Sequence, residues 1–114
     1  MRILNIVAAL SGASALIALA ASHHMPNFDA ARPYVMMGGA VQLSAGLAGL
    51  AIANRSGRLN LIAGTLILGG AALFAGEIYL HSFADIAALD MAAPIGGMLS
   101  ILGWIVLAFA KPSA

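Results

Sequence analysis

Apolar residues follow one another along this chain in four long runs, and the short stretches between the runs carry most of the charged side chains. The runs cover about residues 3–21, 34–53, 59–80 and 91–110. Each has about 20 residues, the length that an α-helix needs to cross the hydrocarbon core of a bilayer. We therefore predict an all-α membrane protein, a bundle of four transmembrane helices that forms a single integral membrane domain over residues 1–114.

The composition supports the membrane assignment and excludes several other classes. Hydrophobic residues make up 62% of the chain and charged residues only 8%, against about a quarter charged in a soluble domain. The net charge is +1 and no basic cluster is present, so we expect no nucleic-acid partner. The chain has no cysteine, which rules out disulfides, thiol catalysis and cysteine-ligated metal or iron–sulfur sites. The partner that the composition predicts is the lipid bilayer.

The ends of the runs contain further signals. Asp90 can cap the N-terminus of the fourth helix, and Pro94 then falls in the first turn, where a missing N–H group is no loss. The N-terminal stretch MRILNIVAALSGASALIALAAS resembles a cleavable signal peptide, because a basic start is followed by an apolar stretch and small residues. Its apolar part is long for a signal peptide, so we predict that it is retained as a membrane helix.

The basic residues predict the orientation of the four helices. The N-terminus, the second loop and the C-terminus carry four of them, whereas the first and third loops carry only Arg32 together with three acidic residues. The four are Arg2, Arg55, Arg58 and Lys111, and the acidic loop residues are Asp29, Asp85 and Asp90. Because basic loops stay on the cytoplasmic side, we predict a multi-pass inner-membrane protein with both termini in the cytoplasm.

Small residues recur at helical spacing in every run and predict where the helices touch. In a bilayer, close approach of the backbones replaces the hydrophobic drive that brings helices together in water. The predicted faces are Ala8, Gly12 and Ala15; Gly39, Gly46 and Gly49; Thr65, Gly69, Ala72 and Gly76; and Gly96, Ser100 and Gly103. They fit either a compact four-helix bundle or the seam of an oligomer or a thin-walled pathway. Gln42 lies on the second face, and we expect its amide to form a hydrogen bond inside the bundle.

Two stretches in the second half of the chain resemble a known family. AGTLILGGAALFAGEIYL is followed by APIGGMLSILGW, and together they resemble domain-of-unknown-function family 423, the YgdD-like small inner-membrane proteins with mitochondrial relatives. The matching residues are Phe74, Gly76 and Tyr79, then Pro94, Ile95, Gly96 and Gly97, and finally Gly103 and Trp104. We interpret all of these except Phe74 and Ile95 as a packing motif.

The resemblance implies four transmembrane helices and no established activity. The sequence departs from the family pattern at three positions. Ala75 and Glu77 stand where the family has serines, and Gly38 stands where it has a histidine early in its second helix. A role that requires both family histidines is therefore not expected in this chain.

Polar side chains gather at the end of the predicted bundle opposite the basic loops. Glu77 and His81 are four residues apart and share one face of the third helix, and His23 and His24 end the first helix on the same side. Three interpretations fit this cluster. Its residues hold helices together, or its imidazoles and carboxylate bind Zn or Cu, or Glu77 belongs to a proton or cation pathway, as acidic residues within membranes often do.

These observations favour a structural or accessory membrane protein over an enzyme. The sequence contains no nucleophile–base pair, zincin motif or phosphate-binding loop. We therefore expect no catalytic residues and no cofactor, with Zn or Cu at the polar cluster as the alternative. The expected protein partner is a second copy of the chain or a larger membrane complex, reached through helix faces. The competing hypothesis is a small transporter that uses the polar cluster.

Overall fold

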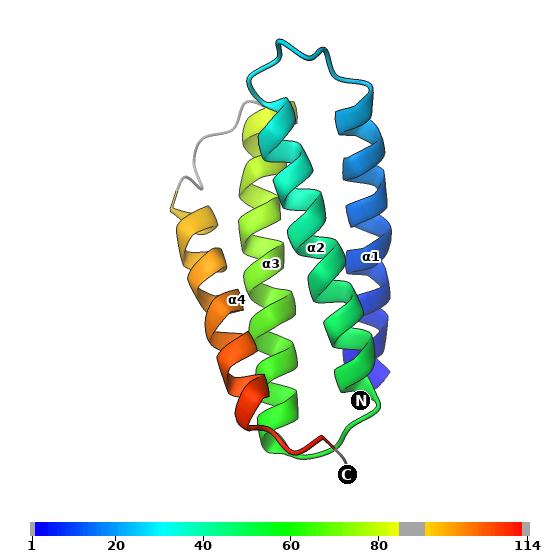
Figure 1. Ribbon diagram of the computed structural model, residues 1–114, viewed down its shortest axis with the longest axis vertical. Helices are drawn as coiled ribbons and strands as arrows, with labels where there is room; N and C mark the ends of the chain where they lie inside the picture. The colour runs from blue at the N-terminus through cyan, green and yellow to red at the C-terminus, as the bar shows by residue number, and fades with distance from the viewer. Residues whose placement is uncertain (1, 85–90, 113–114) are drawn as a thin grey trace.

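The computed structural model describes residues 2–84 and 91–112 and contains four α-helices in these ranges (Figure 1). The helices are α1 (Arg2–His23), α2 (Arg32–Ala53), α3 (Arg58–Ala84) and α4 (Ala92–Phe109). Each is long and apolar enough to cross a membrane. Even α4, the shortest with 18 residues, spans about 27 Å. The predicted all-α bundle of four transmembrane helices is confirmed.

The helix ends differ slightly from the ends of the apolar runs, because polar and proline residues can occupy terminal turns. α2 begins one residue before Pro33, whose missing N–H group costs nothing in a first turn. Pro94 lies in the first turn of α4, as predicted, and α3 continues past its predicted end to Ala84. Met91 occupies the N-cap position of α4 without a side-chain hydrogen bond. The predicted cap, Asp90, lies outside the described residues.

The four helices stand side by side in chain order, and each runs antiparallel to the one before it (Figure 1). α1 packs on α2, α2 on α3 and α3 on α4, whereas α1 touches α3 only lightly and α4 touches no described helix except α3. The start of α1 and the end of α4 lie at the same end of the bundle as the α2–α3 loop (Figure 1). We call this the basic end, because Arg2, Arg55, Arg58 and Lys111 lie there. The end with the α1–α2 loop is the opposite end.

Small residues bring α1 and α2 together, as the sequence predicts. Ala8 and Ala15 of α1 are fully buried, and a Cβ added to Gly46 of α2 would lie only 2.9 Å from the Ala8 carbonyl oxygen. A Cβ on Gly49 would lie 2.8 Å from the Ala8 Cβ and 2.9 Å from a methyl group of Leu68 on α3. Any side chain larger than hydrogen would push these helices apart, so the two glycines set the spacing of α1, α2 and α3.

α3 and α4 approach each other even more closely. A Cβ added to Gly70 of α3 would lie 2.5 Å from the carbonyl oxygen of Gly96 and 2.5 Å from the amide nitrogen of Ser100. A Cβ on Gly103 would lie 2.7 Å from the backbone nitrogen of Ile67. The Ser100 hydroxyl donates a hydrogen bond to the Ile67 carbonyl oxygen at 3.4 Å. Among the described helices, α4 is therefore held by a contact between its own backbone and that of α3.

The structure places the predicted packing face of α3 on the outside. Thr65, Gly69 and Ala72 are exposed, and a Cβ on Gly69 or Gly76 would meet nothing within 4 Å. Gly70, one position along the chain from Gly69, makes the contact with α4 instead. Small residues occur on both sides of α3, and the rotation of about 100° per helical residue separates the side that packs from the side that does not. We call Thr65, Gly69, Ala72 and Gly76 the open face of α3.

Candidate functional site

Two charged side chains order the α1–α2 loop at the opposite end. The Arg32 guanidinium donates from Nε to the Ser22 carbonyl oxygen at 3.0 Å and from Nη1 to Oδ1 of Asn27 at 2.6 Å. A cation on the last carbonyl groups of α1 also suits the negative end of the helix dipole. Asp29 accepts a hydrogen bond at Oδ1 from the backbone N–H of Ala31 at 2.9 Å. The loop therefore holds the Asp29 carboxylate beside the start of α2.

Next to this loop, the start of α2 and the end of α3 border a pocket of about 660 Å³, which we call the Glu77 pocket. Its lining residues are Asp29, Ala30, Ala31, Tyr34, Glu77, Ile78, His81 and Ser82. Glu77 and His81 both face this space, one helical turn apart, as their spacing predicts. Glu77 is partly buried and His81 is exposed. Because two carboxylates and one imidazole share the pocket, its chemistry suits a cation better than an anion.

The two histidines where α1 ends lie elsewhere. His23 and His24 are exposed at the end of α1, and their ring centroids are 5.7 Å apart in an edge-to-face arrangement. Neither is among the residues that line the Glu77 pocket. Within the described residues, no group of three or more His, Cys, Asp or Glu side chains is placed to hold a metal ion. The fold thus divides the predicted cluster, while Asp85 and Asp90 lie outside the described residues.

A second polar group lies inside the bundle, where three helices meet. The Tyr79 hydroxyl of α3 donates to Oε1 of Gln42 on α2 at 2.7 Å, and the Ser11 hydroxyl of α1 donates to the Gln42 carbonyl oxygen at 2.9 Å. Helical side chains lean toward the N-terminus of their helix, so the antiparallel α2 and α3 aim Gln42 and Tyr79 at each other. The Tyr79 ring also covers Gly38, where an added Cβ would lie 3.1 Å from a ring carbon. The predicted internal hydrogen bond of Gln42 is present.

The predicted packing motif does not form one continuous contact. Three of its residues make close contacts inside the bundle: Tyr79, Gly96 and Gly103. The other four lie at the surface, in open space or in ordinary van der Waals contact: Gly76, Pro94, Gly97 and Trp104. Part of the motif therefore packs α3 against its neighbours, and part of it faces the surroundings of the bundle.

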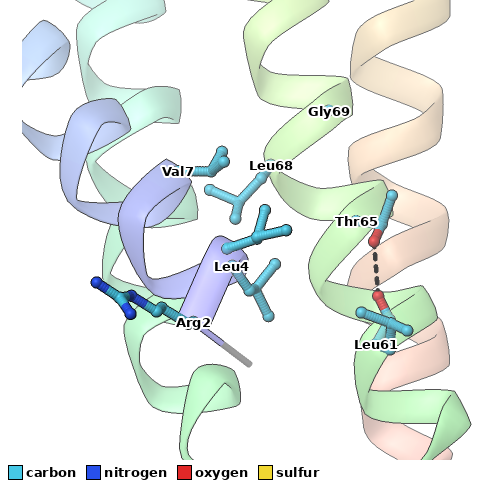
Figure 2. Close-up of a pocket in the computed structure, with 8 residues that line it drawn as sticks. Arg2, Leu4, Val7, Leu61, Thr65, Leu68 and Gly69 are labelled. Carbon is cyan, nitrogen blue, oxygen red and sulfur yellow. Dashed lines mark hydrogen bonds between the residues drawn. The ribbon is translucent and has the colours of Figure 1, made fainter.

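At the basic end, an apolar groove of about 650 Å³ separates α1 from α3 (Figure 2). Its lining residues are Arg2, Ile3, Leu4 and Val7 of α1 and Leu61, Thr65, Leu68 and Gly69 of α3. Figure 2 shows Leu4, Val7 and Leu68 gathered between the two helices, with Arg2 at the end of the groove. The Thr65 hydroxyl donates to the Leu61 carbonyl oxygen at 2.8 Å, so the walls present almost no free polar group. Thr65 and Gly69 belong both to this groove and to the open face of α3.

Sequence reasoning missed a third polar group, which is centred on Asn60 at the basic end. Asn60 is buried, with 2% of its surface exposed. Its Nδ2 donates to the carbonyl oxygens of Ser56 and Lys111 at 3.0 and 2.9 Å, and its Oδ1 accepts from Arg55 at 3.0 Å. The side chain thereby ties the α2–α3 loop to the segment that follows α4. The sequence did contain a signal for this group, a lone amide in an apolar run, because buried amides need hydrogen-bond partners.

Comparison with known proteins finds a family model and one relative that each cover most of the chain. The family model described as "Protein of unknown function (DUF423)" matches residues 8–97. A UPF0382 membrane protein of Staphylococcus aureus is 34% identical over 102 residues, which cover 87% of this chain and 78% of the relative. UPF0382 membrane proteins of Staphylococcus epidermidis and Bacillus subtilis are 40% and 38% identical over 48 residues, which cover 42% of this chain and 39% of each relative. No solved structure matches the chain.

Proposed function

This chain belongs to the DUF423 family of membrane proteins, and we propose that it is a non-enzymatic accessory protein that acts through contacts between helix faces. Its partner is a second copy of the chain or a larger membrane complex. The open face of α3 carries this proposal. Rows of small residues are the surfaces that pack helices in a bilayer, and a Cβ added to Gly69 or Gly76 of this row would meet nothing within 4 Å.

The surroundings of the open face support the same proposal. Lipid tails gain no closer contact from small side chains than from large ones, so a helix that meets only lipid has no need of such a row. Bulky exposed side chains stand beside it, since Ile62 is 40% and Leu73 is 42% exposed. The row therefore leaves a shallow depression along α3 in which the backbone of another helix could approach closely.

We further propose that the protein lies in the inner membrane with both termini in the cytoplasm. Four of the five Lys and Arg residues lie at the basic end, and such residues stay on the cytoplasmic side. A fluorescent protein that matures only in the cytoplasm, fused after Ala114, is expected to be bright. A fusion that is expressed at the normal level but is dark would show that the protein has the opposite orientation.

Gentle detergent extraction followed by co-purification tests the accessory role. The wild-type protein is expected to elute with its partner, and Gly76→Leu is expected to release the partner because leucine fills the open face. The variant should keep its fold, since a Cβ at this position meets nothing within 4 Å. Ala108→Leu, on the exposed surface of α4, is the matched control and should retain the partner. A wild-type protein that elutes alone in every mild detergent would contradict the accessory role.

A second candidate function rests on the Glu77 pocket, where the protein would bind or transport a cation. Asp29, Glu77 and His81 share this space, and acidic residues within membrane segments often mark ion pathways. Purified protein in liposomes would then move a cation or dye against a proton gradient, and Glu77→Gln would abolish this movement with the fold intact. For a metal site, the protein would hold stoichiometric Zn or Cu that Glu77→Gln and His81→Ala each release.

A further inference from the structure

We propose that the groove between α1 and α3 holds an acyl chain of one anionic phospholipid, and that Arg2 and Arg58 bind the phosphate of this lipid at the basic end. The lipid site does not depend on the accessory role proposed above. Its walls come from both α1 and α3 and include Thr65 and Gly69 of the open face, whereas Gly76, where the contact with a protein partner is tested, lies outside the groove.

The groove has the size and the chemistry of a site for an apolar chain. Its volume of about 650 Å³ falls within the roughly 300–1,000 Å³ that is typical of ligand sites. Apart from Arg2, every lining residue is apolar except Thr65, whose hydroxyl is bonded within its own helix. A polar ligand would therefore lose its hydration there without gaining hydrogen bonds, whereas an acyl chain loses nothing.

Two arginines stand at the mouth of this groove. Arg2 lines it, and Arg58 precedes Leu61 by three residues and Thr65 by seven, which places Arg58 on the same face of α3. Both are exposed, and neither forms a hydrogen bond or a salt bridge with a described residue, whereas the other two arginines, Arg32 and Arg55, donate hydrogen bonds to residues of the adjoining loops and helix ends. In Figure 2 the Arg2 guanidinium points away from α3, so binding of a phosphate beside Arg58 requires this exposed, flexible side chain to turn toward the groove. Guanidinium groups bind phosphate strongly, because their donors match its oxygens.

The length of the groove matches one leaflet of a bilayer. From Arg58 to Gly69, α3 rises about 16 Å, and half of the hydrocarbon core of a bilayer is roughly 15 Å. A phosphate at the arginines would therefore direct its acyl chain along the groove to the centre of the membrane. The distance from the two arginines to the far end of the groove, at Gly69, therefore matches the distance from a lipid phosphate to the end of its acyl chain.

Charge also argues against a second copy of this chain in the same part of the groove. Two parallel copies that packed there symmetrically would bring two Arg2 and two Arg58 side chains to one place. Like charges at close range repel, and no described acidic residue lies at the basic end to offset them. An anionic lipid supplies the missing negative charge and the apolar chain in one molecule.

Native mass spectrometry of the detergent-purified protein, titrated with phosphatidylglycerol or with phosphatidylcholine, tests the proposal. The wild-type protein is expected to bind one phosphatidylglycerol in preference to phosphatidylcholine. Each arginine near an anionic lipid contributes about five-fold in affinity, so the double variant Arg2→Gln/Arg58→Gln should bind phosphatidylglycerol roughly 25-fold more weakly. Lys111→Gln removes one exposed charge from the same end without touching the groove, and it should bind like the wild type.

A second pair of variants tests the apolar part of the site without changing any charge. Val7→Phe fills the groove from α1 and should abolish the specific binding, whereas Leu10→Phe, at an exposed position of α1 outside the groove, should not. Gly76→Leu should keep the lipid even where it releases a protein partner, so the two proposals can fail separately. The lipid site is wrong if Val7→Phe binds like the wild type, or if Lys111→Gln weakens binding by about five-fold or more, the loss expected for one groove arginine.

Discussion

Gly69 and Gly70 are neighbours in the chain, yet they face different surroundings. A Cβ on Gly70 would lie 2.5 Å from backbone atoms of α4, whereas a Cβ on Gly69 would meet nothing within 4 Å. The two glycines lie at nearly the same depth in the bundle and differ only by about 100° of rotation around α3. A small residue thus brings membrane helices together only where the partner helix offers a matching backbone surface.

The same contrast extends along the whole of α3. Its closed side carries Asn60, Ile67, Gly70 and Tyr79, which contact the segment after α4, α4 itself and α2. The open face carries Thr65, Gly69, Ala72 and Gly76, which contact no other described helix closely. The closed side fixes the fold, and the open face is where we place interactions with other molecules. Four experiments test this division, from the largest expected effect on stability to the smallest.

Exchange of each neighbouring glycine for alanine should give the largest difference. Gly70→Ala drives a methyl group into the backbone of α4 and should cost about 1–3 kcal/mol of unfolding free energy or more, the range for overpacking. Gly69→Ala should be neutral, or should stabilise the protein by up to about 1 kcal/mol, because alanine favours a helix more than glycine does. Unfolding of the purified protein in mixed micelles, followed by circular dichroism, measures both. Equal changes of the unfolding free energy in Gly70→Ala and Gly69→Ala would mean that α4 does not pack on Gly70.

Removal of the buried amide at the basic end should have the next largest effect. Asn60→Ala leaves the Ser56 and Lys111 carbonyl oxygens and the Arg55 guanidinium without the partner they have in the structure. Loss of such a buried partner costs roughly 1–3 kcal/mol, to be measured by the same unfolding experiment. The matched control is Asn5→Ala, because Asn5 is exposed on α1 and should tolerate the change within about 0.5 kcal/mol.

The hydrogen bond inside the bundle should contribute less. Tyr79→Phe removes the hydroxyl that donates to Gln42 and keeps the ring that covers Gly38. Hydrogen bonds between membrane helices contribute about 0.6 kcal/mol on average and at most roughly 1.7 kcal/mol, so the loss of unfolding free energy should fall in that range. Tyr34→Phe changes an exposed tyrosine of the Glu77 pocket and should leave stability unchanged. If Tyr34→Phe lowered the unfolding free energy as much as Tyr79→Phe does, the hydrogen bond to Gln42 would not be the cause of the loss.

The smallest effect is expected at the Glu77 pocket. Glu77→Gln keeps the shape of a side chain that forms no hydrogen bond or salt bridge with a described residue, so the unfolding free energy should change by less than about 0.5 kcal/mol. A loss well above that value would show that Glu77 holds the bundle together and belongs with the closed side of α3. The same variant, tested for transport and metal content, separates stability from function.

Much of the fold could be predicted from the sequence because it depends on properties of single residues. Run length and apolarity gave the four helices, and the contacts of Gly46 and Gly49 with α1 follow from the predicted small faces of α1 and α2. The partner of Gln42 was not predicted, although its burial was, because several polar groups on three helices could have supplied the hydrogen bond. At the candidate site, the i, i+4 spacing of Glu77 and His81 predicted one shared space. The separation of His23 and His24 from that space depends on how α1 is placed relative to α3.

The sequence by itself determined that this chain crosses a membrane four times and that four of its five Lys and Arg residues lie at one end, because apolarity and charge act through the solvent that surrounds each segment. Only the tertiary structure decided that Gly70 rather than Gly69 packs on α4, that Asn60 holds the segment after α4, and that α1 and α3 leave a groove between them. The physical reason is that the middle of α3, residues 61–76, is apolar on every side apart from Thr65. In water, a polar face would mark the outside of such a helix, but in a bilayer both sides are apolar. The choice between them then depends on the match between two helix surfaces, which no single segment of sequence contains.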